Sequence, residues 1–321
     1  MGVGSCGDAV SDLQRRLASI GIELEGDTPG QYGVGTAQGV RRFQALRGLR
    51  PDGLCGPQTW SALVEAGYRP GDRLLYRKSP MLRGDDVADL QSRLSSLGFD
   101  TGRVDGIFGD NTARSLSEFQ RNAGLVPDGV FGTATAGELA RFQIPGSVPH
   151  LVTGVREREE LRRTGGGVSG TTVAVGQIGD MVSMAATLER TLRQQGAGVL
   201  IINNPDGSIQ AAQANGAGAN LFLGLGLDPD LRACVTSYYS GYSCESSGGR
   251  HMASAIQSRV PRALGISDNG IRGMALPVLR ETRMPAVVCE LGPPAIVVER
   301  SALLCACLVD AVREWCSAFN S

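Results

Sequence analysis

Apolar residues follow a helical spacing that occurs twice in the first part of the chain. Val10, Leu13 and Leu17 fall on one face of a helix, and the same Val-x-x-Leu-x-x-x-Leu spacing returns from Val87 to Leu94. An aspartate lies at the start of each run and a glycine follows each run, as expected at the two ends of a helix. The pattern predicts two helices that belong to an internal repeat.

The repeat continues through a second and a third predicted helix. The pair Phe-Gln lies in the second helix of both copies, and a Pro-Asp-Gly turn follows at residues 51–53 and 127–129. A threonine, Thr59 or Thr135, is expected to open the third helix. Self-comparison therefore predicts two repeats of three helices each. The repeats span residues 4–68 and 76–142.

After residue 170, short apolar runs alternate with helical segments. Such runs, bounded by turn residues, are typical of buried strands in a sheet that helices cover on both faces. The expected strands lie at residues 171–175, 198–203, 219–228, 236–239 and 285–290. The expected helices lie at residues 181–195, 208–217, 249–264 and 301–319. The alternation predicts a doubly wound α/β domain over residues 171–321.

The stretch between the repeats and the α/β domain, residues 143–170, has a different composition. It opens with a break rich in Pro and Gly, and a charged segment at residues 155–163 follows it. The charged segment is predicted to be helical. A solvated charge run and a docking helix for a partner are both consistent with its composition. The whole stretch is therefore assigned as a linker.

Composition and charge exclude several classes of protein. The chain has 321 residues, 42% of them hydrophobic, and a formal net charge of −1, so no overall field attracts nucleic acid or an anionic membrane. No run approaches the roughly 20 apolar residues of a membrane-spanning helix. Residues 1–8 lack the basic start and apolar core of a signal peptide. We therefore expect a cytoplasmic protein, with peripheral attachment to the inner membrane as an alternative, and no nucleic-acid partner.

The repeated segments resemble the peptidoglycan-binding type 1 module, a small three-helix bundle. The second copy follows the module's pattern with Val-Asp-Gly-Ile-Phe-Gly at residues 104–109, whereas the first copy departs from it. The turn before the second helix contains an aromatic residue in each copy, Tyr32 or Phe108, that a cell-wall ligand could contact. Asp105 and Asp128, in Asp-Gly turns, complete the candidate ligand-binding residues. A place in the core is the alternative for Phe108.

The α/β segment resembles the zinc-dependent N-acetylmuramoyl-L-alanine amidases of the amidase_3 family. The sequence Met-Pro-Ala-Val-Val-Cys-Glu-Leu-Gly at residues 284–292 and the run at 219–228 carry the resemblance. In the family the corresponding strand contains a zinc-binding histidine, and Gly226 occupies that position here. Glu290 occupies the position of the family's catalytic glutamate. Because glycine has no side chain, the resemblance implies a lost metal ligand.

The family's other metal ligands are also missing from their expected positions. A catalytic zinc site needs three protein ligands and an open position for water. The turn and the loop that supply the other two ligands in the family have no counterpart at residues 173–181. The chain's two histidines, His150 and His251, lie elsewhere. We therefore expect a chain without catalytic residues, metal or cofactor, in which Glu290 is a remnant.

Two type 1 modules followed by an amidase domain without zinc ligands resemble the CwlM-type pseudo-amidases of actinobacteria. This resemblance implies a non-catalytic regulator or scaffold of peptidoglycan synthesis that binds and activates MurA, the UDP-N-acetylglucosamine enolpyruvyl transferase. It also implies control by a Ser/Thr kinase and contact with the lipid II machinery. Two alternatives stay open: a binding module for muropeptides or lipid-linked precursor, and an active zinc amidase.

Overall fold

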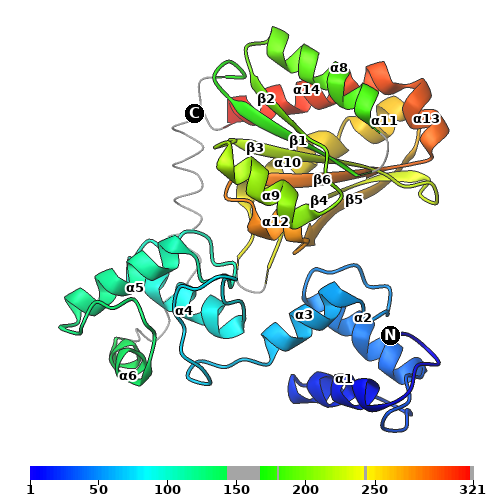
Figure 1. The fold of residues 1–321 in the computed structure, drawn as a ribbon. Coiled ribbons are helices and arrows are strands. Elements are labelled where there is room, and N and C mark those ends of the chain that lie inside the picture. The colour runs from blue at the N-terminus through cyan, green and yellow to red at the C-terminus, as the bar shows by residue number, and fades with distance from the viewer. Residues whose placement is uncertain (143–166, 179–180, 242–243, 319–321) are drawn as a thin grey trace. The chain divides into compact units, whose positions relative to one another are not determined.

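The computed structural model describes residues 1–142, 167–178, 181–241 and 244–318 (Figure 1). The chain divides into two compact units, one built on the described residues up to 142 and one built on those from 167 onward. Within these described ranges, no helix combines the length and the apolar run that crossing a bilayer requires. The predicted charged helix at 155–163, most of its linker, and His150 lie outside the described residues.

The first unit contains two bundles of three helices each. The first bundle has α1 (Asp8–Ser19), α2 (Val34–Leu46) and α3 (Pro57–Ala66), and the second has α4 (Asp85–Ser96), α5 (Asp110–Asn122) and α6 (Thr133–Arg141). Val10, Leu13 and Leu17 of α1 are buried in the core of the first bundle together with Phe43 and Leu63. The predicted tandem of three-helix bundles is confirmed.

The third helix of each bundle begins two residues before the predicted threonine. α3 begins at Pro57 and α6 at Thr133, each directly after a glycine with extended backbone. Proline suits the first position of a helix because its missing N–H group has no partner there. Thr59 and Thr135 therefore lie inside the first turn, where both are buried.

The second unit alternates strands and helices. Its strands are β1 (Thr172–Ile178), β2 (Gly198–Ile202), β3 (Leu221–Leu227), β4 (Ala233–Tyr239), β5 (Ser267–Met274) and β6 (Ala286–Leu291). Its helices are α8 (Val182–Gln194), α9 (Gly207–Gly216), α10 (Ser247–Gln257), α11 (Val260–Leu264), α12 (Pro277–Glu281), α13 (Pro294–Glu299) and α14 (Ser301–Ala318). The strands form one sheet in the order β2-β1-β3-β6-β4-β5. The first four in this order are parallel, whereas β4 is antiparallel to β6 and β5 is parallel to β4.

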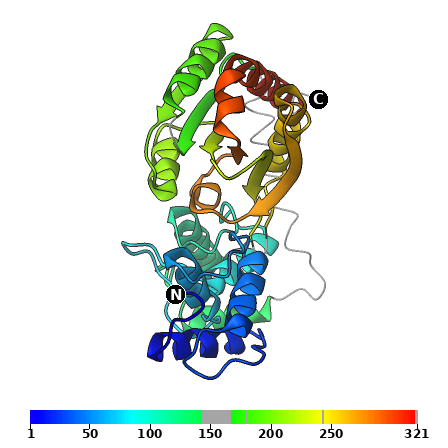
Figure 2. The same cartoon turned by 90° about the vertical axis from the view of Figure 1, so that its right-hand side faces the viewer.

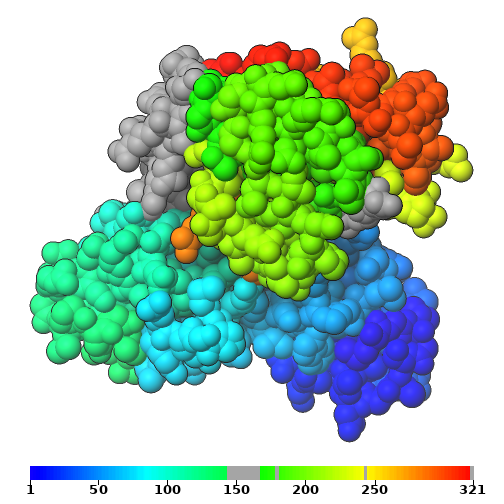
Figure 3. Space-filling view, turned by 45° about the horizontal axis from the view of Figure 1, so that its top comes forward, coloured from blue at the N-terminus to red at the C-terminus, as the bar shows by residue number. Residues whose placement is uncertain are grey.

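Helices cover both faces of this sheet (Figures 1 and 2). On one face, α8, α10, α11 and α14 bury inward side chains of the strands such as Val175, Leu223 and Val287. On the other face, α9 and α12 pack together, and α9 covers Gly176 and Phe222. In Figure 3, the green segment that contains α8, β2 and α9 faces the viewer. The predicted doubly wound α/β domain is confirmed, and its sheet is mixed.

The sequence pattern misses the strand β5 and the short helices α12 and α13. Most residues of β5 are exposed at the edge of the sheet, so no apolar run marks this strand. The pattern also predicts one helix over 249–264, whereas the structure has α10 and α11 on either side of a break at Ser258 and Arg259. Pro261, in the first turn of α11, lacks the N–H group that a continuous helix would use.

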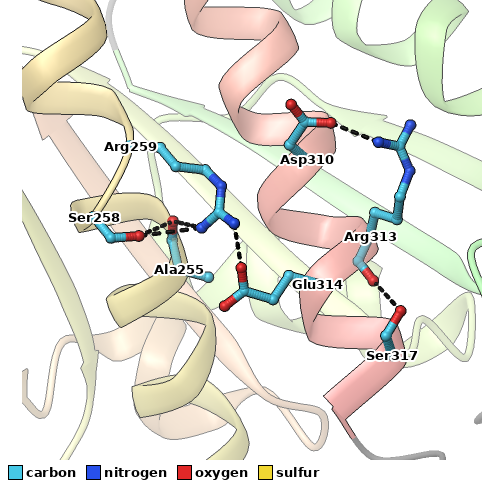
Figure 4. A network of polar contacts seen from close by, with 7 residues as sticks. All are labelled: Ala255, Ser258, Arg259, Asp310, Arg313, Glu314 and Ser317. Carbon is cyan, nitrogen blue, oxygen red and sulfur yellow. Dashed lines mark hydrogen bonds and ion pairs between the residues drawn. The ribbon is translucent and has the colours of Figure 1, made fainter.

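A polar network joins the end of α10 to α14 at the surface (Figure 4). Arg259 donates to the carbonyl of Ala255 at 2.9 Å and forms an ion pair with Glu314 of α14. Asp310 and Arg313 form a further pair within α14 at 2.6 Å. Because these side chains are partly exposed to solvent, each pair contributes at most about 1 kcal/mol. The buried apolar contacts between the two helices therefore contribute more to their packing than these ion pairs do.

Candidate functional site

Gly226 and Glu290, which the resemblance aligns with the family's histidine and glutamate positions, lie side by side in the sheet. Gly226 of β3 and Glu290 of β6 are register partners in adjacent parallel strands, and Ile178 of β1 pairs with Gly226 from the other side. Gly226 is buried and Glu290 is half-buried. A Cβ atom built on Gly226 would lie 3.4 Å from Glu290 Cγ. The backbone therefore keeps a place for a side chain next to the carboxylate, but the sequence supplies none.

The connection between β1 and α8 is short. β1 ends at Ile178 and α8 begins at Val182, so three residues, 179–181, join them. A turn that presents a metal-binding histidine, followed by a loop that presents a glutamate, does not fit into three residues. The element boundaries therefore agree with the shortening that the sequence indicates at this place.

The donor groups around Gly226 do not fit a catalytic zinc ion. Strand pairing surrounds Gly226 and Glu290 with Ile178 and Val235, neither of which has a donor side chain. Within the described ranges, no three or more His, Cys, Asp or Glu side chains gather closely enough to hold a metal. His251 belongs to α10, on the face of the sheet opposite α9. One carboxylate is not a zinc site, which needs three protein ligands.

A buried glutamine fills the space over the neighbouring strand. Gln210 of α9 is 1% exposed, and its Nε2 donates to the carbonyl oxygens of Gln177 at 3.2 Å and Asn204 at 2.5 Å. Its Oε1 lies directly over Gly176, which pairs with β3 in the sheet. Gln210 thus joins the end of β1 to the loop before α9, and its amide has buried hydrogen-bond partners.

Alanine substitutions at Gly226 and Gly176 compare a position with room for a methyl group and one without it. We expect Gly226→Ala to leave the free energy of unfolding unchanged or to raise it by up to about 1 kcal/mol, because its methyl group meets nothing closer than 3.4 Å. Gly176→Ala is expected to cost about 1–3 kcal/mol, since its methyl group would lie 2.5 Å from the Phe222 ring and overlap Gln210. Chemical denaturation measures both values, and equal losses would contradict the open space at Gly226.

Two asparagines of the α/β unit tie separate segments of its fold together. Asn215, at the end of α9, donates to the carbonyl of Glu281 at 2.8 Å and accepts from the N–H of Arg283 at 2.8 Å. Asn220 accepts from the N–H of Thr172 at 2.8 Å, which ties the start of β3 to the start of β1. These contacts give both asparagines a structural role in the α/β unit.

The two aromatic candidates in the bundles are core side chains. Tyr32 is 2% exposed and Phe108 is 0% exposed. The Tyr32 hydroxyl donates to the carbonyl of Gly53 at 2.8 Å, and burial raises the pKa of Tyr32 to about 12. Phe108 packs in the core of the second bundle with Leu116 and Phe131. Neither ring is exposed at the surface of its bundle.

The two aspartate candidates are bound by glutamines of the preceding helices. Asp105 accepts from Gln91 Nε2 at 3.0 Å, and Asp128 accepts from Gln120 Nε2 at 2.8 Å. The backbone N–H of Val130 and the Gln120 amide lower the pKa of Asp128 below its ordinary value. These contacts give both carboxylates a role in holding their turns. Binding of a cell-wall ligand by the four candidates stays a prediction.

Four buried glutamines close the turns of both bundles. Each donates from Nε2 to a threonine of the following helix and accepts at Oε1 from the N–H of a turn glycine, at 2.8–3.1 Å. The sets are Gln14 with Gly30 and Thr36, Gln44 with Gly53 and Thr59, Gln91 with Gly106 and Thr112, and Gln120 with Gly129 and Thr135. The recurrence of Gln, Gly and Thr in the same order is the signal that identifies them.

Comparison with known protein families matches three segments of the chain. Residues 6–63 and 83–139 match the family described as a putative peptidoglycan binding domain. Residues 177–294 match the family described as N-acetylmuramoyl-L-alanine amidase. The fold and these segments together define an amidase-type chain that carries a tandem of peptidoglycan-binding modules.

One relative is similar to this chain over nearly its whole length, and others are similar over part of it. The N-acetylmuramoyl-L-alanine amidase CwlM of Mycobacterium tuberculosis (strain ATCC 25618 / H37Rv) is 33% identical over 96% of this chain and 86% of its own length. CwlL of Bacillus licheniformis is 32% identical over 39% of this chain and 41% of its own length. The solved amidase Ami1 of Mycobacterium smegmatis is 13% identical, with a TM-score of 0.40 over 47% of this chain and 99% of that chain. The chain belongs to the N-acetylmuramoyl-L-alanine amidase family that includes CwlM.

Proposed function

We propose that this chain is a non-catalytic member of its family and acts as a cytoplasmic regulator or scaffold of peptidoglycan synthesis. One observation carries the proposal: the strand position next to Glu290, where the family needs a metal-binding imidazole, is Gly226. Hydrolysis of an amide by such an enzyme needs a metal-activated water and a carboxylate that accepts its proton. Glu290 alone supplies the carboxylate but not the activated water.

The retained architecture supports a binding role. Both bundles keep buried cores, and the α/β unit keeps its sheet with helices on both faces. A chain that loses its metal ligands but keeps every layer of the fold still presents the surfaces of that fold. The partner proposed for these surfaces is MurA, on the strength of the resemblance to CwlM-type chains. Control by a Ser/Thr kinase and contact with the lipid II machinery are part of the same proposal.

Titration of the full chain into purified MurA tests the proposed partnership. We expect saturable binding by calorimetry and a rise in the rate of enolpyruvyl transfer when the chain is added. Gly226→Ala is the matched control, because it alters the vestigial site and leaves the surfaces unchanged, so it should bind MurA as the unaltered chain does. Absence of binding, with both proteins folded, would rule out MurA as the direct partner.

A second candidate function is binding of muropeptides or lipid-linked precursor by the tandem bundles. The match of residues 6–63 and 83–139 to a peptidoglycan binding family favours it. Co-sedimentation of the full chain with purified peptidoglycan tests this candidate independently of MurA. Retention that soluble muropeptides reverse would support it, whereas recovery of the whole chain in the supernatant would contradict it.

A further inference from the structure

Two consecutive aspartates at the start of α4 each bind an arginine that lies earlier in the chain. Arg47, the residue after α2, donates from both terminal nitrogens to the Asp85 carboxylate at 2.7 and 2.6 Å. Arg73 donates from Nε and Nη2 to the Asp86 carboxylate at 2.7 and 3.0 Å. Paired hydrogen bonds of this kind between guanidinium and carboxylate are short, directional and stronger than neutral ones.

The Arg47–Asp85 pair connects the two bundles directly. Arg47 follows the second helix of the first bundle, and Asp85 is the first residue of the second bundle's first helix. The two side chains are 18% and 26% exposed, so solvent screens this pair less than it screens a fully exposed one. The Phe43 ring lies 5.8 Å from the Arg47 guanidinium and limits where that group can go.

The Arg73–Asp86 pair fixes the segment between the bundles. The Asp86 side chain is 1% exposed, and the Arg73 guanidinium stacks on the Tyr68 ring at 3.6 Å. Arg73 also donates to the carbonyl of Arg83 at 2.6 Å. A buried carboxylate needs its cation, because removal of one partner leaves an uncompensated charge. The connecting segment is therefore folded onto the start of α4.

Two of these four residues, Arg47 and Asp86, lie at positions where the two repeats differ, whereas Asp85 matches Asp8 of the first repeat. Arg47 precedes a Gly-Leu pair, and the residue at the same place in the second repeat is Ala123. Asp86 lies between an aspartate and a valine, and the residue at the same place in the first repeat is Ala9. The glutamines, glycines and threonines that close the turns occur in both repeats. The arginine–aspartate pairs therefore do not belong to the fold of a single bundle.

We propose that the Arg47–Asp85 and Arg73–Asp86 pairs form a clamp that holds the two bundles as one rigid body. This inference is independent of the proposed function. Its consequence is that corresponding surfaces of the two bundles keep a fixed separation and orientation. A partner or ligand that contacts both bundles then meets one preorganised surface, and its binding loses less entropy than binding to two freely jointed bundles.

Residual dipolar couplings of backbone amides in the full chain test the clamp. One alignment tensor should fit the couplings of α1–α3 and α4–α6 together in the unaltered chain. In Arg47→Gln, which removes the charge and the paired guanidinium hydrogen bonds to Asp85, the two bundles should require separate tensors. A need for two tensors in the unaltered chain would overturn the proposal, as would a single tensor in the variant.

Three further variants distinguish loss of the ion pair from unfolding of one bundle. Asp85→Asn removes the same pair from the other side and should likewise give two tensors. Arg42→Gln, on the exposed surface of α2, is the matched control and should keep one tensor. The exchange of charges in Arg47→Asp/Asp85→Arg restores an ion pair and should move the couplings back toward one tensor. Failure of this exchange to do so, with both cores folded by their amide shifts, would contradict the clamp.

Discussion

Replacement of Gln44 by leucine is expected to unfold most of the first bundle while the rest of the chain stays folded. The Gln44 amide donates to Asp52, to the carbonyl of Leu54 and to Thr59, and it accepts from the N–H of Gly53. Leucine removes these four hydrogen bonds and leaves the buried N–H of Gly53 without its acceptor, at a total cost of about 3–4 kcal/mol. Because a bundle of about 60 residues has only a few kcal/mol of stability, this loss is nearly all of it.

Hydrogen exchange of the full chain measures this effect bundle by bundle. In Gln44→Leu, peptides from α1 to α3 should lose their protection, whereas peptides from β1 onward should keep theirs. Gln58→Leu is the matched control, because Gln58 is exposed on α3 of the same bundle and its replacement should leave protection unchanged. Equal exchange in the two variants would show that Gln44 does not hold the turn.

Gly292→Ala is the second substitution with a large expected effect, about 3 kcal/mol or more of the stability of the α/β unit. A methyl group at residue 292 would overlap the backbone carbonyl oxygens of Asp228 and Leu231. These oxygens belong to the loop between β3 and β4, so relief of the overlap requires movement of the backbone. The Gly292 N–H also donates to the carbonyl of Ala233 at 3.1 Å, and that hydrogen bond would move with it.

Thermal unfolding followed by circular dichroism compares Gly292→Ala with a second glycine of the same unit. A Cβ atom at Gly216, in the last turn of α9, meets no atom within 4 Å. Gly216→Ala should therefore leave the melting temperature unchanged or raise it, since alanine restricts the unfolded chain more than glycine does. A similar change of melting temperature in both variants would show that the loop between β3 and β4 moves away from residue 292 at little cost.

Much of the fold was predictable because the residues that form its cores follow local apolar patterns. The helical spacing from Val10 to Leu17 recurs in the second repeat, and β3 is buried along nearly its whole length, so it reads as a continuous apolar run. The edge strand β5 follows no such pattern, because one side of it has no neighbouring strand and most of its side chains are in solvent. Local composition therefore identifies central strands more readily than edges.

The candidate site was predictable in part. The loss of a side chain at Gly226 is visible in the sequence, but its place beside Glu290 depends on the pairing of β3 with β6, which are not consecutive strands. The burial of Tyr32 was not predictable, because the residues of a turn do not show which of their side chains face the core. The glutamines that hold these turns have partners up to 22 residues away, beyond the reach of a local pattern.

The measurement that tests the absence of catalysis most directly is zinc content by elemental analysis after zinc loading, with muropeptide hydrolysis assayed on the same sample. With Gly226 at the ligand position and three residues between β1 and α8, we expect no stoichiometric zinc and no release of stem peptide. One zinc per chain together with cleavage of the amide bond would contradict this account and would show that the chain assembles a metal site from other residues.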